Sequence, residues 1–163
     1  MSKQKNTIGP ISREHHESLL LALHLQQGEK ILAKTVSYDP IDQAREIVDF
    51  YNLHLADHFE IEERILFPSV SRFIPTTAAL INELTEEHRR LEQMIDEFRK
   101  EIFKDIDHSL REFGALLEEH IRKEDEQLFP LFDRHAPATA FDEIEKQIQK
   151  FYEQRRKPAE ENS

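Results

Sequence analysis

A segment of eleven residues occurs twice in this chain, and the repeat restricts the folds open to it. The first copy runs from His58 to Pro68 and the second from His120 to Pro130. Five residues match at a constant offset of 62 positions, and in the first copy they are His58, Glu62, Leu66, Phe67 and Pro68. We interpret the match as an internal duplication, in which two related halves fold together.

Each copy places a histidine four positions before a glutamate, as in His58 and Glu62 or in His120 and Glu124. On an α-helix this separation is about 400° of rotation and about 6 Å of rise, so both side chains leave nearly the same face, one turn apart. Imidazole and carboxylate groups are ligands for divalent transition metals. The repeat therefore predicts helices that carry metal ligands.

The composition favours amphipathic helices. Hydrophobic residues make up 38% of the 163 residues, charged residues make up 34%, and only three are glycine. The absence of cysteine excludes disulfides, thiol catalysis and iron–sulfur ligation, so any metal must be held by nitrogen and oxygen. The net charge of −11 argues against nucleic acid and anionic membranes as partners.

The length suits one domain with a full core, which we expect over about residues 12–155. Residues 1–11 are expected to form a flexible N-terminus and residues 156–163 a charged tail. The first residues lack the apolar core of a signal peptide, and no apolar run reaches membrane-spanning length. We therefore expect a cytoplasmic protein.

Hydrophobic periodicity and capping residues predict five helices, at about 12–36, 40–67, 76–103, 107–133 and, for a shorter one, 139–155. Ser12, Asp39 and either Asp105 or Asp107 are the expected N-caps. Pro68 should perturb the end of the second helix, with room for a last turn as far as Arg72. Short loops between long helices favour an all-α, up-down-up-down four-helix bundle. The fifth helix would lie across an end or a side, or mediate self-association as a homodimer.

In each half, one helix offers a histidine near its start and the next helix offers the His-x-x-x-Glu pair. A pseudo-twofold arrangement then brings together His15 or His16, His58, Glu62, His88, His120 and Glu124. Four imidazoles and two carboxylates suit two metal ions, with the carboxylates shared between them. Without metal, two buried glutamates would cost several kcal/mol.

The choice between His15 and His16 stays open at this point. His15 matches His88 because both follow a glutamate. His16 matches it because both have apolar residues three and seven positions later. We favour His16 slightly and keep His15 as the alternative.

These motifs resemble the hemerythrin-like family, also called the HHE cation-binding domain. The resemblance rests on Glu-His in the first helix, Glu87-His88, and the two His-x-x-x-Glu motifs with their Leu-Phe-Pro sequences, over about residues 12–133. It implies a non-haem di-iron site with bridging carboxylates and one iron position open to a small ligand. Oxygen carriers of the family have a second histidine one turn after the one at His88. This chain has Glu92 there, which weakens the case for a reversible oxygen carrier and leaves Glu92 as a further ligand or a hydrogen-bonding acid.

The resemblance implies a protein that binds two iron ions and binds or senses dioxygen, nitric oxide or iron itself. A di-iron enzyme that consumes peroxide or oxidises iron is the alternative, but no acid or nucleophile stands out beyond the ligands. A helical interaction module with a structural metal site is the third reading. Other divalent metals, such as zinc or manganese, could fill the same ligands. A partner protein would have to read any signal, because the chain has no effector domain.

The remaining polar and aromatic residues are expected to have structural roles. His54 would either orient a ligand or be a polar core residue at the bundle end. Phe67 and Phe129 would fill the core and limit solvent entry. The residues expected at the surface or on a solvated face are His24, His108, Glu60, Glu63, Asp125 and Glu126.

Overall fold

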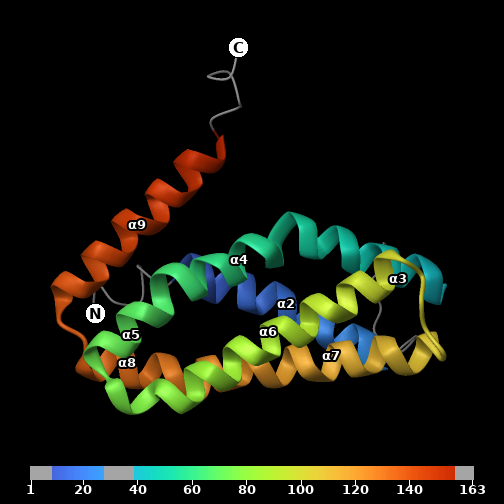
Figure 1. Cartoon of the computed structure of the whole chain (residues 1–163), viewed down its shortest axis with the longest axis horizontal. Coiled ribbons are helices and arrows are strands. Elements are labelled where there is room, and N and C mark those ends of the chain that lie inside the picture. The colour runs from blue at the N-terminus through green and yellow to red at the C-terminus, as the bar shows by residue number, and fades with distance from the viewer. Residues whose placement is uncertain (1–8, 28–38, 157–163) are drawn as a thin grey trace.

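A computed structural model describes residues 9–27 and 39–156 of the chain. These residues form helices and turns, with no strand among them, which confirms the all-α prediction. The long helical stretches lie beside one another, and the C-terminal helix stands at one end (Figure 1). None of the described helices combines the length and the apolar character that crossing a membrane requires.

The first helix, α2, spans Gly9–Gln27. It begins three residues before Ser12, the predicted N-cap, so this position lies inside the helix. The last part of the predicted range, 28–36, lies outside the described residues.

The second stretch runs without a break from Pro40 to Phe73 and alternates ordinary α-helix with wider π-helical turns. Its segments are α3 (Pro40–Phe50), η2 (Tyr51–Leu55), α4 (Ala56–Ile61), η3 (Glu62–Leu66) and α5 (Phe67–Phe73). Asp39 caps the stretch as predicted, because its carboxylate accepts the backbone N–H of Ile41 at 2.9 Å.

Pro68 does not end this stretch, which continues one residue past the limit allowed at Arg72. The N–H of Phe67 reaches back five residues to the carbonyl of Glu62, as in a π-helix. Proline lacks an N–H and crowds the carbonyl four residues before it. The wider turn accommodates the ring, so the helix continues instead of breaking.

The third stretch consists of η4 (Pro75–Thr77) and α6 (Ala78–Arg99), and the fourth consists of α7 (Ile106–Lys123), η5 (Glu124–Leu128) and α8 (Phe129–His135). α6 ends before the predicted position 103, because Glu101 has a φ of 54°, which a right-handed helix does not allow. Asp105, one of the two predicted caps, accepts the backbone N–H of His108 at 3.1 Å. The fifth helix, α9, spans Ala138–Arg156.

Buried apolar side chains form two clusters, with a layer of buried polar residues between them. On α6, Leu84 belongs to one cluster and Leu91 to the other, and His88 lies between them. The fourth stretch repeats this order, because Leu117 and Leu128 belong to different clusters and flank His120. The apolar clusters therefore hold the polar layer in place from both ends.

α2 and α7 approach each other closely at Gly114. A Cβ atom at this position would lie 2.7 Å from the carbonyl oxygen of Ala22 and 3.1 Å from the Cβ of Leu25. The contact with Ala22 involves a backbone atom, so a side-chain rotation cannot relieve it. Glycine at position 114 therefore sets the distance between α7 and α2, the helix that carries His15.

Replacing Gly114 with alanine should destabilise the protein by about 1–3 kcal/mol, because the added methyl group overpacks this contact. Helix propensity alone predicts the opposite sign, a gain of roughly 0.5–1 kcal/mol. Urea denaturation of the variant and the parent would measure the difference. A variant as stable as the parent would contradict the close approach of the two helices.

Candidate metal centre

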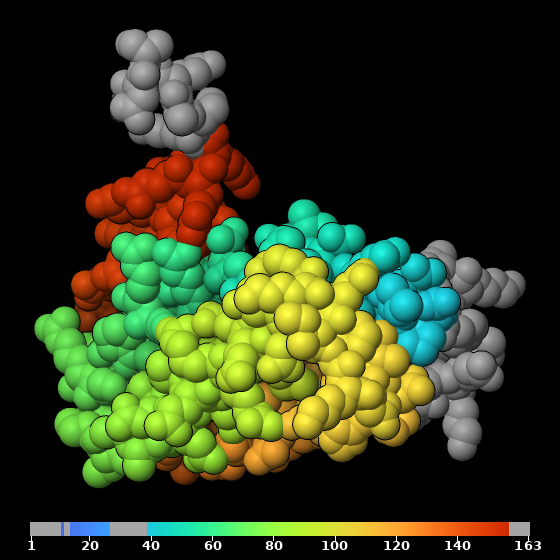
Figure 2. All heavy atoms as spheres, turned by 45° about the vertical axis from the view of Figure 1, so that its right-hand side comes forward, coloured from blue at the N-terminus to red at the C-terminus, as the bar shows by residue number. Residues whose placement is uncertain are grey.

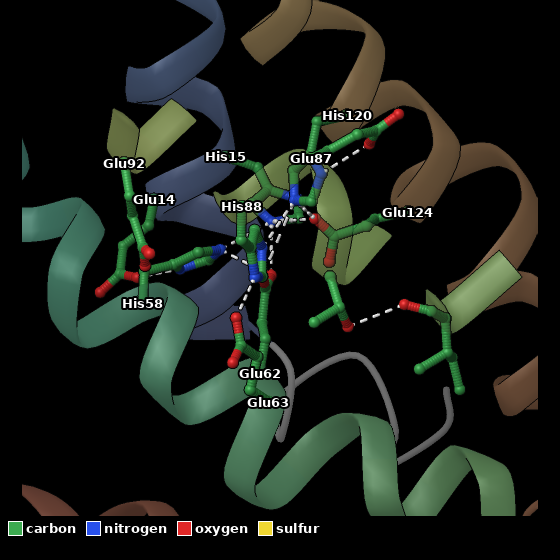
Figure 3. A network of polar contacts seen from close by, with 12 residues as sticks. Glu14, His15, His58, Glu62, Glu63, Glu87, His88, Glu92, His120 and Glu124 are labelled. Carbon is green, nitrogen blue, oxygen red and sulfur yellow. Dashed lines mark hydrogen bonds and ion pairs between the residues drawn. The ribbon is translucent and has the colours of Figure 1, made fainter. Parts of the chain in front are cut away.

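Six ionisable side chains from the four long stretches meet in the polar layer of the bundle (Figure 3). Each is at most 4% exposed to solvent. They are His15 of α2, His58 of α4, Glu62 at the start of η3, His88 of α6, His120 of α7 and Glu124 at the start of η5. The residues form two groups that could each hold a metal ion and that share Glu62.

The first group, here called the His15–His58 half, consists of these two histidines and Glu62. The Nε2 atoms of the two histidines lie 3.0 Å apart. Oε1 of Glu62 lies 2.7 Å from Nε2 of His58 and 3.4 Å from Nε2 of His15. Three potential ligand atoms therefore face one small volume.

The second group, the His88–His120 half, has four members because Glu124 joins Glu62 and the two histidines. The Nε2 atoms of its histidines also lie 3.0 Å apart. Oε2 of Glu62 is 3.0 Å from Nε2 of His88, and Oε1 of Glu124 is 2.6 Å from Nε2 of His120. Glu62 thus presents one oxygen to each half, as a bridging carboxylate would.

The outer nitrogen of every clustered histidine is held by its own carboxylate. In the first half, Nδ1 of His15 lies 2.9 Å from Asp125 and Nδ1 of His58 lies 2.5 Å from Glu14. An ionised carboxylate can only accept a hydrogen bond, so each Nδ1 carries the proton and donates.

The second half repeats this arrangement. Nδ1 of His88 donates to Glu63 at 2.7 Å, and Nδ1 of His120 donates to Glu87 at 2.9 Å. In both halves, the acid next to one ligand orients a histidine from another helix. These bonds fix the ring orientation and turn all four Nε2 atoms inward.

The inward-facing atoms are acceptors without donors. With the proton on Nδ1, a neutral imidazole presents a lone pair at Nε2. Oε2 of Glu62 and both carboxylate oxygens of Glu124 are buried and make no hydrogen bond of acceptable geometry within the described part of the chain. Lone pairs that face each other at 3.0 Å repel, so the site requires cations, either protons or metal ions.

The pKa values of two histidines agree with this requirement for cations, because both are raised. Burial opposes the charged form of His15, but its hydrogen bonds to Asp125 and Glu62 outweigh burial and raise its pKa to about 9. Burial likewise opposes charge on His58, but attraction to Glu62 prevails and raises its pKa to about 10. Metal ions bind neutral imidazole, so they must displace these protons, and binding should weaken as the pH falls.

The two glutamates differ in their preferred charge. Burial opposes ionisation of Glu62, but attraction to His58 lowers its pKa well below the usual value. Burial and the neighbouring charge of Glu62 raise the pKa of Glu124. Two carboxylates this close cannot both be ionised without cations between them.

The π-helical turns begin at the two ligand glutamates. η3 starts at Glu62 and η5 at Glu124, and in each half the His-x-x-x-Glu pair immediately precedes the wide turn. The spacing of the pair is therefore that of an α-helix, which puts both groups on one face. In the Leu-Phe-Pro sequence that follows, the leucine is the last residue of the wide turn, and the phenylalanine and proline begin the next α-helical segment.

Aromatic rings cover the histidines. Phe129 stacks on His15 with ring centres 5.6 Å apart, and Phe67 stacks on His88 at 5.9 Å. Phe59 stacks more closely on His88, at 4.0 Å. Phe67 and Phe129 are buried core residues as predicted, and they reduce the space for water beside the imidazoles.

The structure corrects the choice between the two histidines of α2. His15 is buried in the cluster, whereas His16 is exposed. The preceding glutamate was the informative signal, because Glu14 and Glu87 both hold a histidine of the other helix in their half. The apolar residues three and seven positions after His16, Leu19 and Leu23, are only partly buried.

The prediction that Glu63 and Asp125 belong to a solvated face describes only part of their role, because Asp125 is exposed and Glu63 is partly exposed, yet both also contact the cluster. Each follows a ligand glutamate, and each accepts the Nδ1–H of a histidine on another helix. A sequence signal was present, since an acid follows the ligand glutamate in both copies of the repeat. The partner histidine could not be identified, because it comes from a distant part of the chain.

Three further residues lie where the sequence did not place them. His24, expected at the surface, is buried on α2, which packs along α7. His54 is exposed and is not among the clustered residues. Glu92 is no ligand in this arrangement, and it pairs with Arg89 at 2.6 Å. His108, Glu60 and Glu126 lie at least partly in solvent.

Replacing His15 with alanine should weaken zinc binding more than about tenfold, because the loss of an outer hydrogen-bond partner already costs that much at comparable sites. The same change at His16 is a matched control, since the neighbouring side chain is exposed. Calorimetric titration of both variants with zinc would measure the difference. Equal affinities would show that α2 contributes no ligand at position 15.

Removing the carboxylate of Asp125 by alanine substitution should lower zinc affinity by about 10–100-fold, because His15 then loses the acceptor that orients it. The alanine variant of Glu126 is the control, since that residue follows in the same helical turn and is 67% exposed. If both variants bound zinc like the parent, the hydrogen bond between Asp125 and His15 would have no part in metal binding.

Comparison with known protein families agrees with this geometry. The family described as the hemerythrin HHE cation binding domain matches residues 8–132, which is most of the chain. A search of curated proteins found no significant match. The matched range contains all six clustered residues and the four carboxylates that hold the histidines. The chain therefore belongs to the hemerythrin HHE cation-binding domain family.

Proposed function

We propose that this protein binds two iron ions in the centre formed by the two halves and uses them to bind or sense a small ligand such as dioxygen or nitric oxide. One observation carries the proposal. Four Nε2 atoms and the oxygens of two carboxylates converge in a buried volume, while every Nδ1 is occupied by an outer carboxylate. A buried set of acceptors without donors is what a metal centre requires.

The donor set is compatible with iron. Imidazole nitrogens with carboxylate oxygens suit iron, zinc and manganese, and the chain has no cysteine for softer ions. Glu62, with one oxygen directed to each half, supports a pair of ions instead of one. The specific choice of iron comes from the resemblance to di-iron members of the family.

Bound iron would supply electron exchange and a coordination position for the small ligand. The residues of the chain orient the ligands, exclude water and balance the charge. The outer carboxylates keep the imidazoles oriented and raise their basicity. Phe59, Phe67 and Phe129 exclude water from the sides of the rings. Glu62 and Glu124 balance the charge of the ions.

Binding or sensing is favoured over catalysis. The four carboxylates next to the centre orient its histidines, so none of these four is free to act as an acid or a nucleophile. A reversible oxygen carrier is disfavoured, because the position one turn after His88 holds Glu92, which pairs with Arg89. As a sensor, the protein would act through a partner protein. We also propose that residues 12–155 form one domain with up-down-up-down connectivity.

Anaerobic loading with ferrous iron followed by air should give two irons per chain and the absorption bands of an oxo-bridged pair near the ultraviolet–visible boundary. A band that reverses when oxygen is removed would support binding, and turnover of peroxide or ferrous iron would support an enzyme instead. Alanine at Glu62 should abolish the bands, and alanine at the exposed Glu126 should leave them unchanged. Iron content below one ion per chain in the parent protein would overturn the proposal.

A further inference from the structure

α9 lies beyond the residues that match the family, which end at 132, yet it contacts the part of the bundle that holds His15 and His58. The hydroxyl of Tyr152 donates to Oε1 of Glu14 at 3.4 Å. The guanidinium of Arg155 lies 3.6 Å from Asp57 and also binds Glu60. These contacts connect α9 to both α2 and α4.

The contacted acids are the immediate neighbours of ligands. Glu14 precedes His15 in the chain, and its other oxygen accepts the Nδ1–H of His58. Asp57 directly precedes His58. Movement of α9 would therefore change the positions of both histidines of the His15–His58 half.

Apolar packing joins the same elements. Ile148 and Phe151 of α9 are buried in one cluster with Ile11 of α2 and with Ile61 and Ile65, which flank Glu62. Figure 2 shows α9, in red, against the green segment that includes α5. α9 thus packs on the elements that carry His15, His58 and Glu62.

The other half is secured differently. Its outer carboxylates Glu63 and Glu87 are paired with the cations of Arg89 and Lys123. Among the described side chains, no lysine or arginine pairs with the corresponding acids Glu14 and Asp125.

The sequence explains this inequality. Arg89 follows His88, and the residue that follows the equivalent His15 is His16, which is no permanent cation. Lys123 precedes Glu124, and the residue that precedes the equivalent Glu62 is Ile61, which has no charge. The two halves have therefore lost equivalence in the residues that support the outer carboxylates. On Glu14, the hydroxyl of Tyr152 is the donor that takes the place of a cation.

We propose that α9 is a latch that controls how fast the ion of the His15–His58 half exchanges. The proposal rests on the proposed function, since it requires two bound ions. The His15–His58 half has three clustered ligands and the other half has four, so its ion is the one more easily released. α9 slows this release by holding Glu14 and Asp57, and with them the two histidines.

The test uses the full chain loaded with two zinc ions per protein and then mixed with an excess of chelator. Zinc release should occur in two phases of one ion each. The double variant Tyr152→Phe, Arg155→Gln should accelerate the fast phase by roughly three- to tenfold, as expected for the loss of two weak, partly exposed contacts. The slow phase should not change.

Arg156→Gln is the matched control, because this neighbouring arginine is exposed and makes the same change in charge. Metal-free forms of the parent and the double variant should melt at the same temperature. This measurement distinguishes the latch from a general loss of stability, which would lower the melting temperature of the variant. Equal acceleration of both phases, no acceleration, a lower melting temperature of the metal-free variant, or the same effect from Arg156→Gln would each overturn the latch. A parent protein that never holds two zinc ions would instead overturn the dinuclear proposal and the latch with it, before chelator is added.

Discussion

The structure depends on the hydrogen bond between a histidine Nδ1–H and a carboxylate, made once for each of four histidines. This bond decides which ring nitrogen carries the proton, so it determines that the lone pairs of Nε2 point into the bundle. Without it, four buried imidazoles could satisfy one another or turn away. With it, the interior is a set of acceptors that only cations can stabilise.

The same bonds also organise the helices. Glu14 on α2 holds a histidine of α4, and Asp125 on η5 holds a histidine of α2. Each bond therefore crosses between two long stretches, and the four bonds together join all of them. The apolar clusters on either side of the polar layer restrict the rotation of each helix to its apolar face. The polar layer fixes the rotation, because a turned helix would leave buried charges unpaired.

Much of the centre could be predicted from the sequence, because the two copies of a repeat are expected to adopt the same local structure. The offset between His58 and His120 identified four of the six clustered residues directly, since both copies had to occupy equivalent places. The ends of the helices were also predictable within a few residues where Asp39 or Asp105 provided a cap. Pro68 was the exception, because its effect depended on a π-helical turn, and such a turn has no strong signature in the order of residues.

The sequence by itself determined the helical class, the metal-binding motif and the two-halved architecture, because periodicity and repetition are properties of neighbours along one chain. Tertiary structure alone decided that His15 and not His16 faces the cluster, and that Glu63 and Asp125, although at least partly exposed, also hold histidines of other helices. It also decided that α9 contacts Glu14 and Asp57, the neighbours of His15 and His58 in the chain. The physical reason is common to all three: each depends on which distant helix lies opposite a given face, and spacing within one helix does not carry that information.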